Sequence, residues 1–256
     1  MSEAETQPIE QRYLASVSHE IRTPLNGILG MASLLAETEL TPAQADYVSA
    51  IRRSGARLLD LLNNVLDYAR MDAAGVELET AETDIRGLAQ DVVELLSPRA
   101  HEKGIDVCVR AAGDLPDKVV LDDGRVRQIL FNIVGNAIKF TEKGGVLVDL
   151  STRKDNELCI DIIDSGPGLT DEAQARLFNA FEQAEAGHRG IDGGVGLGLT
   201  IVNRLVEAMN GSVTITSAPG IGARFRILLP LNVAAAAKPA ERAGQPKRIG
   251  LAGMST

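Results

Sequence analysis

The chain has 256 residues, of which 45% are hydrophobic and only 3% aromatic, and its formal net charge is −9 at pH 7. That length suits one large or two ordinary domains with cores built mainly from aliphatic side chains. The acidic balance argues against nucleic acid or an anionic membrane as ligand, although a local basic site could still bind nucleotide phosphates. No run approaches the roughly 18 apolar residues of a membrane helix, and residues 1–10 lack a signal-peptide core, so we expect a soluble, cytoplasmic chain without membrane contact.

The first predicted element is a long helix from about Pro8 to Ala36. Apolar or seam positions recur in steps of three and four, as in a coiled-coil seam, at Leu14, Val17, Ile21, Pro24, Ile28, Met31 and Leu35. This spacing predicts that His19 lies on the side of the helix away from the seam, facing water. Glu20 is beside it in sequence, and Thr23 is about one helical turn further on. Pro24 predicts a kink or loosened turn. An exposed imidazole beside a carboxylate suits nucleophilic work, and a merely solvated pair is the alternative.

A second helix begins at Thr41, as N-cap, with Pro42 in its first turn, and extends to about Arg70. Its seam steps again by three and four through Val48, Ile51, Gly55, Leu58, Leu62, Val65 and Ala69. One hairpin cannot cover so wide an apolar stripe, so we expect a homodimer that forms a four-helix bundle through residues 8–70. The alternative is a hairpin packed on the rest of its own chain.

Residues 71–82 read as a linker, and residues 83–231 read as a second domain. Its predicted helices span 84–101, 123–140 and 171–177, with one more running from a glycine-rich loop to about 210. Its predicted strands span 105–110, 118–121, 146–151, 158–163, 212–217 and 223–229. Without repeated β-α-β units this order predicts an α+β sandwich, a sheet covered by helices on one face. Residues 232–256 have the composition of a linker or tail, and their more apolar end fits either a further domain or a docking strand.

The two cysteines, Cys108 and Cys159, lie in strand-like stretches without the paired spacing of metal ligands. We expect both to be buried, reduced thiols. With three histidines and no Cys-x-x-Cys, a structural zinc site is not expected.

A polar stripe lies opposite the apolar face of the predicted helix 123–140. It carries Gln128, Asn132, Asn136 and Lys139. Amides and an ammonium group on one stripe suit a magnesium-phosphate group, because Mg²⁺ takes hard oxygen ligands and phosphates take positive donors. A solvated helix face is the alternative, but such a face normally carries Glu and Lys pairs.

Two glycine-containing loops complete a candidate nucleotide site. Asp164 ends a strand and is followed by Gly166 and Gly168, a place where a carboxylate can accept a hydrogen bond from the amine of adenine. The loop 193–200 leads into a helix whose free N–H groups can hold phosphate oxygens. A dinucleotide-type loop is the rival, but no hydrophobic strand immediately precedes these glycines.

Ser-His-Glu-Ile-Arg-Thr-Pro-Leu-Asn, at residues 18–26, resembles the H-box of sensor histidine kinases of the HisKA type. The stretches that begin at Asn132, Asp164, Phe178 and Gly194 resemble the N, G1, F and G2 boxes of the kinases' ATP-binding domain, a Bergerat fold. The resemblance covers nearly all of residues 10–231. It implies a kinase core that moves the γ-phosphoryl of Mg-ATP onto a histidine and then to an aspartate of a response-regulator receiver domain.

The same resemblance implies a role for individual residues. His19 is the phosphoacceptor, Glu20 its general base, and Thr23 would position water if the protein also dephosphorylates its partner. Asn136 holds Mg²⁺, Asn132 and Lys139 lie near the phosphates, and Asp164 reads adenine beside Gly166 and Gly168. The remaining implied residues anchor or line a lid over ATP, namely Phe178, Phe181, Gly194, Gly196, Leu197 and Gly198.

One position departs from the family pattern. Val195 stands where the family usually has Thr or Ser, which removes a hydroxyl donor and puts the strength of ATP binding in doubt. Two other functions fit the chain: a clamp-type ATPase of the same fold, and a scaffold or phosphatase with weak kinase activity. The fold alone permits the first, and Val195 is the only support for the second.

Overall fold

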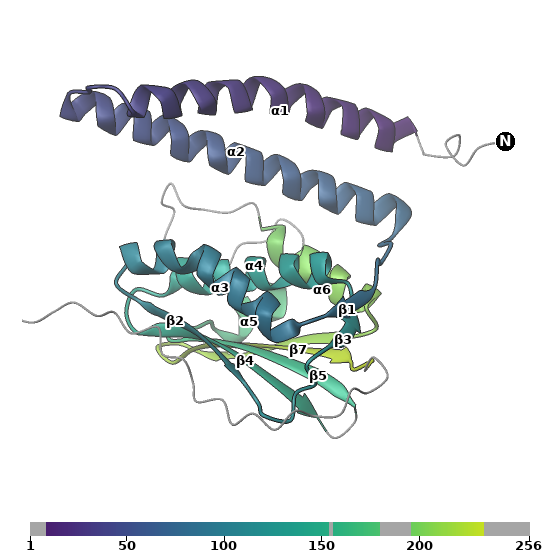
Figure 1. Cartoon of the computed structure of the whole chain (residues 1–256). Helices are drawn as coiled ribbons and strands as arrows, with labels where there is room; N and C mark the ends of the chain where they lie inside the picture. Colours follow the sequence, from purple (N-terminus) through teal and green to yellow (C-terminus); the bar gives the residue numbers. More distant parts are fainter. Residues whose placement is uncertain (1–8, 154–155, 180–195, 233–256) are drawn as a thin grey trace, which may run out of the picture. The chain divides into compact units, whose positions relative to one another are not determined.

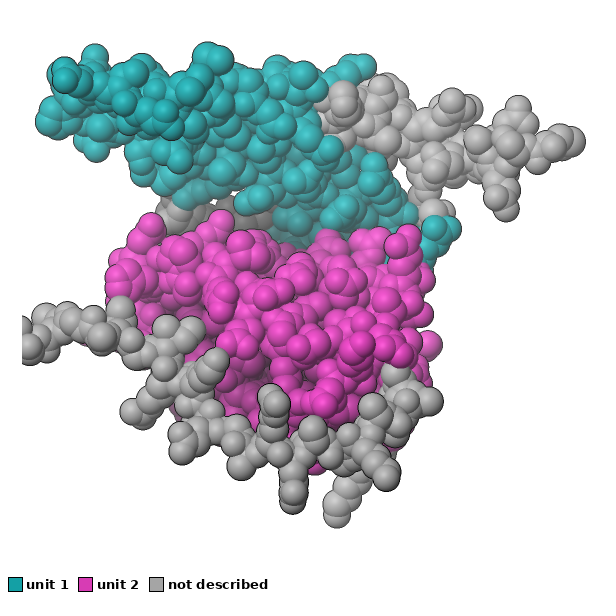
Figure 2. All heavy atoms as spheres, in the orientation of Figure 1, with its two compact units in different colours: residues 1–77, 175–208 teal, residues 78–174, 209–256 magenta. Residues whose placement is uncertain are grey.

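The computed structural model describes residues 9–153, 156–179 and 196–232, and for residues 9–19 and 73–74 it describes only the helical backbone. The chain forms two compact units (Figure 2), one made of residues 1–77 and 175–208, the other of residues 78–174 and 209–256. Within the described residues, no helix has the length and apolar character needed to span a membrane.

Two long helices, α1 (Ile9–Ala36) and α2 (Pro42–Ala74), form an antiparallel hairpin in the first unit (Figure 1). The predicted start of α2 is confirmed, because the Thr41 side chain accepts from the Gln44 backbone N–H while the Gln44 side chain accepts from the Thr41 N–H at 2.9 Å. The helix α1 continues through Pro24 without interruption. The helix α2 extends past Arg70, its predicted end, since Met71 is still buried, and it stops at Gly75, where φ is +75°.

The apolar side chains of the hairpin form two faces, and the residues predicted at the seam of α1 lie mostly on the exposed one. One face packs α1 against α2 and buries Leu25, Ala32, Val48 and Leu66. Here the helices approach so closely that a Cβ on Gly55 would lie 2.6 Å from the Leu29 side chain. The other face leaves large apolar side chains exposed within the single chain: Ile21, Ile28, Met31, Leu34, Leu35, Tyr47, Ile51, Leu58 and Leu61. Several of these were predicted at the seam, so the hairpin alone does not bury its own stripe.

The first unit also contains α6 (Gly198–Ala208). Arg204 of this helix donates to the Asp72 carboxylate at 2.8 Å and to the Tyr68 hydroxyl at 3.2 Å. Its guanidinium also lies 4.3 Å from the centre of the Tyr68 ring. These contacts attach α6 to the C-terminal part of α2.

A five-stranded sheet forms the centre of the second unit, in the order β2-β4-β5-β7-β6. The strands are β2 (Asp106–Ala111), β4 (Gly145–Arg153), β5 (Glu157–Asp164), β6 (Ser212–Ala218) and β7 (Gly222–Pro230). The strand β2 pairs in parallel with β4, and the other neighbours are antiparallel. A small separate sheet pairs β1 (Ala81–Thr83) with β3 (Val119–Leu121). The strand β1 was not predicted, because three residues give too few alternations to reveal a strand.

The helices α3 (Ile85–Glu102) and α4 (Asp123–Phe140) cover one face of this sheet (Figure 1), and α5 (Asp171–Arg176) follows β5. Fully buried side chains of α4, such as Ile129 and Ile133, share the core with strand residues such as Leu150 and Ile160. The predicted α+β fold is therefore confirmed.

The opposite face of the sheet carries a row of four charges. In register across the strands lie Arg110, Asp149, Asp161 and Arg226. Arg110 and Arg226 each bind the neighbouring aspartate through two nitrogen atoms, at 2.6 to 2.8 Å. Cys108 lies on this face of the edge strand β2 and is exposed, so the prediction of a buried thiol was wrong there, whereas Cys159 is buried as predicted. Strand alternation does not reveal which face the helices cover.

Candidate functional site

The position of the polar stripe on α4 follows from where the helix begins and from which of its sides is buried. Asp122 caps the N-terminus and accepts from the Arg125 N–H at 2.9 Å. The apolar side is fully buried and comprises Val126, Ile129, Leu130, Ile133, Val134, Ala137 and Ile138. Asn132, Asn136 and Lys139 are consequently left half-buried on one side of the helix. The Asn132 amide nitrogen is buried and has no hydrogen-bond partner in the described part of the chain.

Asp164 lies at the end of β5 with its carboxylate held by the backbone. Its Oδ1 accepts from the N–H of Gly166 at 2.8 Å and from that of Ala223 at 3.2 Å. Burial raises the pKa of this carboxyl group, and the two N–H donors oppose that rise only in part. Both donors meet the same oxygen, so the geometry leaves Oδ2 available as an acceptor for a ligand amine.

Close backbone contacts explain the glycines around Asp164. At Gly166 a Cβ would lie 2.8 Å from Asp164 Oδ1 and 3.5 Å from Thr141 Oγ1. At Gly168, where φ is +70°, a Cβ would overlap the Ala218 carbonyl, so this glycine allows two segments of the protein to meet. Gly222 has φ +99° and a Cβ there would overlap the Asp164 carbonyl oxygen. Gly222 was not predicted as a site residue, although the sequence Pro-Gly-Ile-Gly indicates a turn there.

The residues of this second unit fit an adenine nucleotide. The Asn132 amide nitrogen, which has no partner among the described residues, and the Lys139 ammonium group could bind phosphate oxygens. The second oxygen of the Asp164 carboxylate could accept from the adenine amine. Within the described residues no three His, Cys, Asp or Glu side chains gather in a way that could hold a metal ion. A magnesium ion at Asn136 would therefore take most of its ligands from the nucleotide and water.

The remaining predicted residues lie in the first unit. His19 is on α1 and its side chain lies outside the described residues, whereas Glu20 and Thr23 are exposed on the same helix. Phe178 is half-buried, and its carbonyl accepts from the Thr200 hydroxyl at 3.1 Å. Gly198 opens α6, Gly196 has φ +75° and Leu197 is buried. Phe181, Gly194 and Val195 lie outside the described residues.

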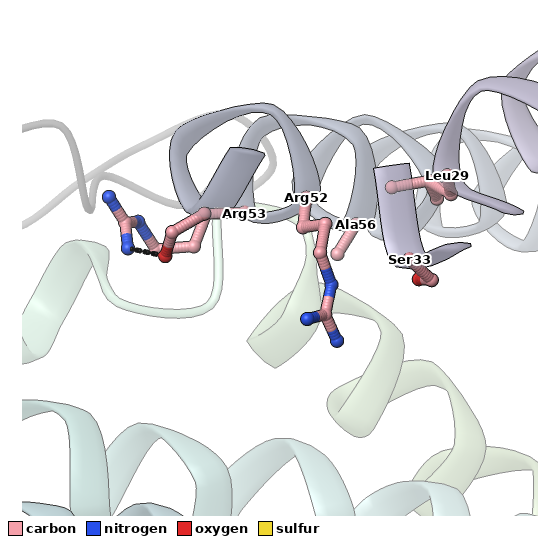
Figure 3. Close-up of a pocket in the computed structure, with 6 residues that line it drawn as sticks. Leu29, Ser33, Arg52, Arg53 and Ala56 are labelled. Atoms are coloured by element: carbon pink, nitrogen blue, oxygen red, sulfur yellow. Dashed lines mark hydrogen bonds between the residues drawn. The ribbon is translucent and has the colours of Figure 1, made fainter. Parts of the chain in front are cut away.

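A separate open groove of about 430 Å³ lies on the hairpin (Figure 3). It is lined by Leu29, Ser33, Ser49, Arg52, Arg53 and Ala56. By helical phase, its α1 residues lie away from the exposed apolar residues Ile28 and Met31. Its two arginines make it basic in an otherwise acidic protein. This groove could not be predicted from the sequence, because it arises only where the two helices pack.

Comparison with known families assigns both parts of the chain. The family described as "His Kinase A (phospho-acceptor) domain" matches residues 9–74. The family described as "Histidine kinase-, DNA gyrase B-, and HSP90-like ATPase" matches residues 121–233. The helical hairpin and the α+β sandwich thus define a phosphoacceptor domain followed by an ATP-binding domain.

Individual relatives agree with this assignment. The chain is 41% identical over 230 residues to the signal transduction histidine-protein kinase BarA of Escherichia coli (strain K12), and 41% identical over 231 residues to the sensor histidine kinase GacS of Pseudomonas protegens. These matches cover 88% and 89% of this chain but 25% of each relative. A crystal structure of full-length ShkA in complex with AMPPNP superposes with a TM-score of 0.74 at 49% identity, covering 88% of this chain and 47% of that one. The chain belongs to the histidine kinase family and spans about a quarter of the length of these curated relatives.

Proposed function

We propose that this chain is the autokinase core of a two-component system, which transfers the γ-phosphoryl group of Mg-ATP to His19. In this reaction an imidazole nitrogen forms a bond to the γ-phosphorus, the bond to the bridging oxygen breaks, and ADP leaves. Glu20 accepts the imidazole proton. The observation that carries the proposal is the combination, in one chain, of the family match around His19 with the Asp164 carboxylate site of the second unit.

The nucleotide-site residues divide the work of binding ATP. Asp164 accepts the adenine amine beside Gly166 and Gly168, Asn132 and Lys139 bind phosphate oxygens, and Asn136 is a magnesium ligand. Gly196, Leu197 and Gly198 precede or open α6, whose N-terminal N–H groups would hold phosphate. Phe178 and Phe181 anchor a lid that includes Gly194. Phosphoryl transfer needs little beyond such positioning and charge neutralisation.

The same proposal covers the organisation of the chain. The dimerisation and phosphotransfer domain, predicted at residues 8–70, extends to the end of α2 at Ala74, and the linker, predicted at 71–82, shortens to the residues between α2 and β1. Residues 83–231 form the catalytic domain and 232–256 a linker or tail. The apolar face that the single hairpin leaves exposed supports a homodimer, because a second copy of the same face would bury it. We place the chain in the cytoplasm, as the cytosolic part of a larger sensor, in line with the longer relatives.

The partner that accepts the phosphoryl group is, in this proposal, an aspartate on a response-regulator receiver domain. The basic groove with Arg52 and Arg53 suits a partner that is acidic around its phosphoacceptor. Thr23 lies about one helical turn from His19, a place from which a hydroxyl can orient water for dephosphorylation of that partner.

Incubation with γ-labelled ATP and Mg²⁺ tests the proposal. The parent protein should acquire acid-labile, base-stable label, which a receiver domain then removes, while His19→Gln and Asn136→Ala should acquire none. Phosphate release without labelled protein would instead support a clamp-type ATPase. Receiver dephosphorylation that depends on Thr23, combined with weak nucleotide binding, would support a phosphatase or scaffold.

A further inference from the structure

We propose that Thr141 is a further nucleotide-binding residue, whose hydroxyl group forms a hydrogen bond to the edge of the adenine base, directly or through one water molecule. This inference rests on the proposed function and assigns a role to a residue for which the sequence analysis gave none.

The burial of Thr141 is the first observation. Its relative exposure is 0%, and its Oγ1 has no hydrogen-bond partner in the part of the chain that the structure describes. A buried hydroxyl without a partner is unfavourable, so such groups are rare unless a ligand or water satisfies them. The chain therefore keeps a polar group where valine would fill the same volume.

The place of this hydroxyl is the second observation. Thr141 Oγ1 and Asp164 Oδ1 border the same small space beside Gly166. A Cβ on Gly166 would lie in this space, 3.5 Å from Thr141 Oγ1 and 2.8 Å from Asp164 Oδ1. A side chain at residue 166 would fill this space. The Thr141 hydroxyl thus lies beside the carboxylate that the proposed function assigns to the adenine amine.

A purely structural role does not explain the hydroxyl. Thr141 ends α4 through its backbone N–H, which donates to the Ala137 carbonyl at 3.0 Å, and its backbone is extended at φ −78° and ψ 125°. A β-branched residue such as valine adopts this conformation readily, so the cap does not need the oxygen. The edge of adenine offers both a donor and an acceptor, and a hydroxyl can pair with either.

The test compares Thr141→Val, which removes the hydroxyl and keeps the shape, with Thr141→Ser, which keeps the hydroxyl. We expect Thr141→Val to weaken ADP and AMPPNP binding about five- to tenfold by titration calorimetry, and Thr141→Ser to stay within about twofold of the parent. Without nucleotide, Thr141→Val should melt roughly 2–4 °C higher than the parent, because an unpaired buried polar group is gone.

The opposite combination would overturn the inference: Thr141→Val that melts lower without nucleotide while binding ADP like the parent would show a structural hydroxyl. Unchanged melting and unchanged affinity would overturn it too. Asp164→Asn serves as the reference for lost base recognition. If the parent itself binds no adenine nucleotide, the proposed function fails together with the inference, whereas parent binding that Thr141→Val leaves intact removes the inference alone.

Discussion

Asp164 combines a buried charge with two backbone donors on one oxygen, and this arrangement lets its charge be tested apart from its shape. In Asp164→Asn the amide oxygen can still accept from Gly166 and Ala223, while an NH₂ group replaces the second acceptor. We expect nucleotide affinity to fall at least about 100-fold, since two donors then face each other in the bound state. The measurement is titration with a fluorescent ATP analogue, and circular dichroism confirms the fold. Binding close to that of the parent would contradict the role of Asp164.

The pH dependence of binding follows from the same carboxyl group. Burial raises the pKa of Asp164, so its acceptor form is lost at a higher pH than for an ordinary aspartate as the solution is acidified. Nucleotide affinity should weaken as pH falls through this raised pKa. Folding stability without nucleotide should respond with the opposite sign, because a raised carboxyl pKa means that the charged form, present at higher pH, is the destabilising one in the fold. Asp164→Asn should remove both dependences, and equal dependences in parent and variant would contradict this assignment.

Individual site residues differ in how well the sequence predicts them. Asn132, Asn136 and Lys139 follow from helical spacing, because one turn of a helix fixes which side chains share a side. Thr141 and Gly222 do not, because their significance lies in a void and a backbone approach formed by segments far apart in sequence. Asp164 could be placed at the end of a strand, but its two donors come from different parts of the chain.

At the scale of elements, the charged row on the outer face of the sheet contains two similar ion pairs with different burial. The side chains of Arg226 and Asp161 are 30% and 9% exposed, whereas those of Arg110 and Asp149 are 65% and 20% exposed. Arg226→Met should lower the free energy of unfolding by about 3 kcal/mol, since it leaves a buried carboxylate unpaired. Arg110→Met is the matched control, and it should have a clearly smaller effect because solvent screens that pair. Urea denaturation measures both, and equal losses would contradict the burial argument.

The groove between α1 and α2 gives a prediction about the partner. Arg52→Glu with Arg53→Glu reverses the charge of two residues that line the groove. Phosphotransfer to an acidic receiver domain should slow about tenfold or more, with the loss shrinking as salt is raised. Autophosphorylation should stay within about twofold of the parent, which separates partner docking from catalysis. A variant that transfers as fast as the parent at low salt would contradict the docking role.

The elements themselves were largely predictable, because long periodic helices and strands of regular alternation carry strong local signals. The helix α2 runs beyond its predicted end because the burial of Met71 outweighs the weak local pattern after Arg70. The strand β1 exists only through pairing with β3, a contact across the chain that local sequence does not encode. Exposure of Cys108 likewise depends on which sheet face the helices cover.

At the scale of the whole molecule, the exposed apolar face of the hairpin requires a partner surface. Ile51→Glu places a charge on that face and should convert a dimer into a monomer in sedimentation experiments, because burying the carboxylate twice in one bundle is costly. Ala56→Glu puts the same side chain in the groove and should leave the dimer intact. A monomeric parent, or a dimer that tolerates Ile51→Glu, would contradict the four-helix bundle.

Phosphorylation of the His19 imidazole is tested most directly by peptide mass spectrometry at alkaline pH. After incubation with Mg-ATP, the account predicts phosphate on the peptide that contains His19 and none on those with His101 or His188, the only other histidines. The modification should be absent from Asn136→Ala. Phosphate on another residue, or ATP consumption without any phosphohistidine, would contradict the account.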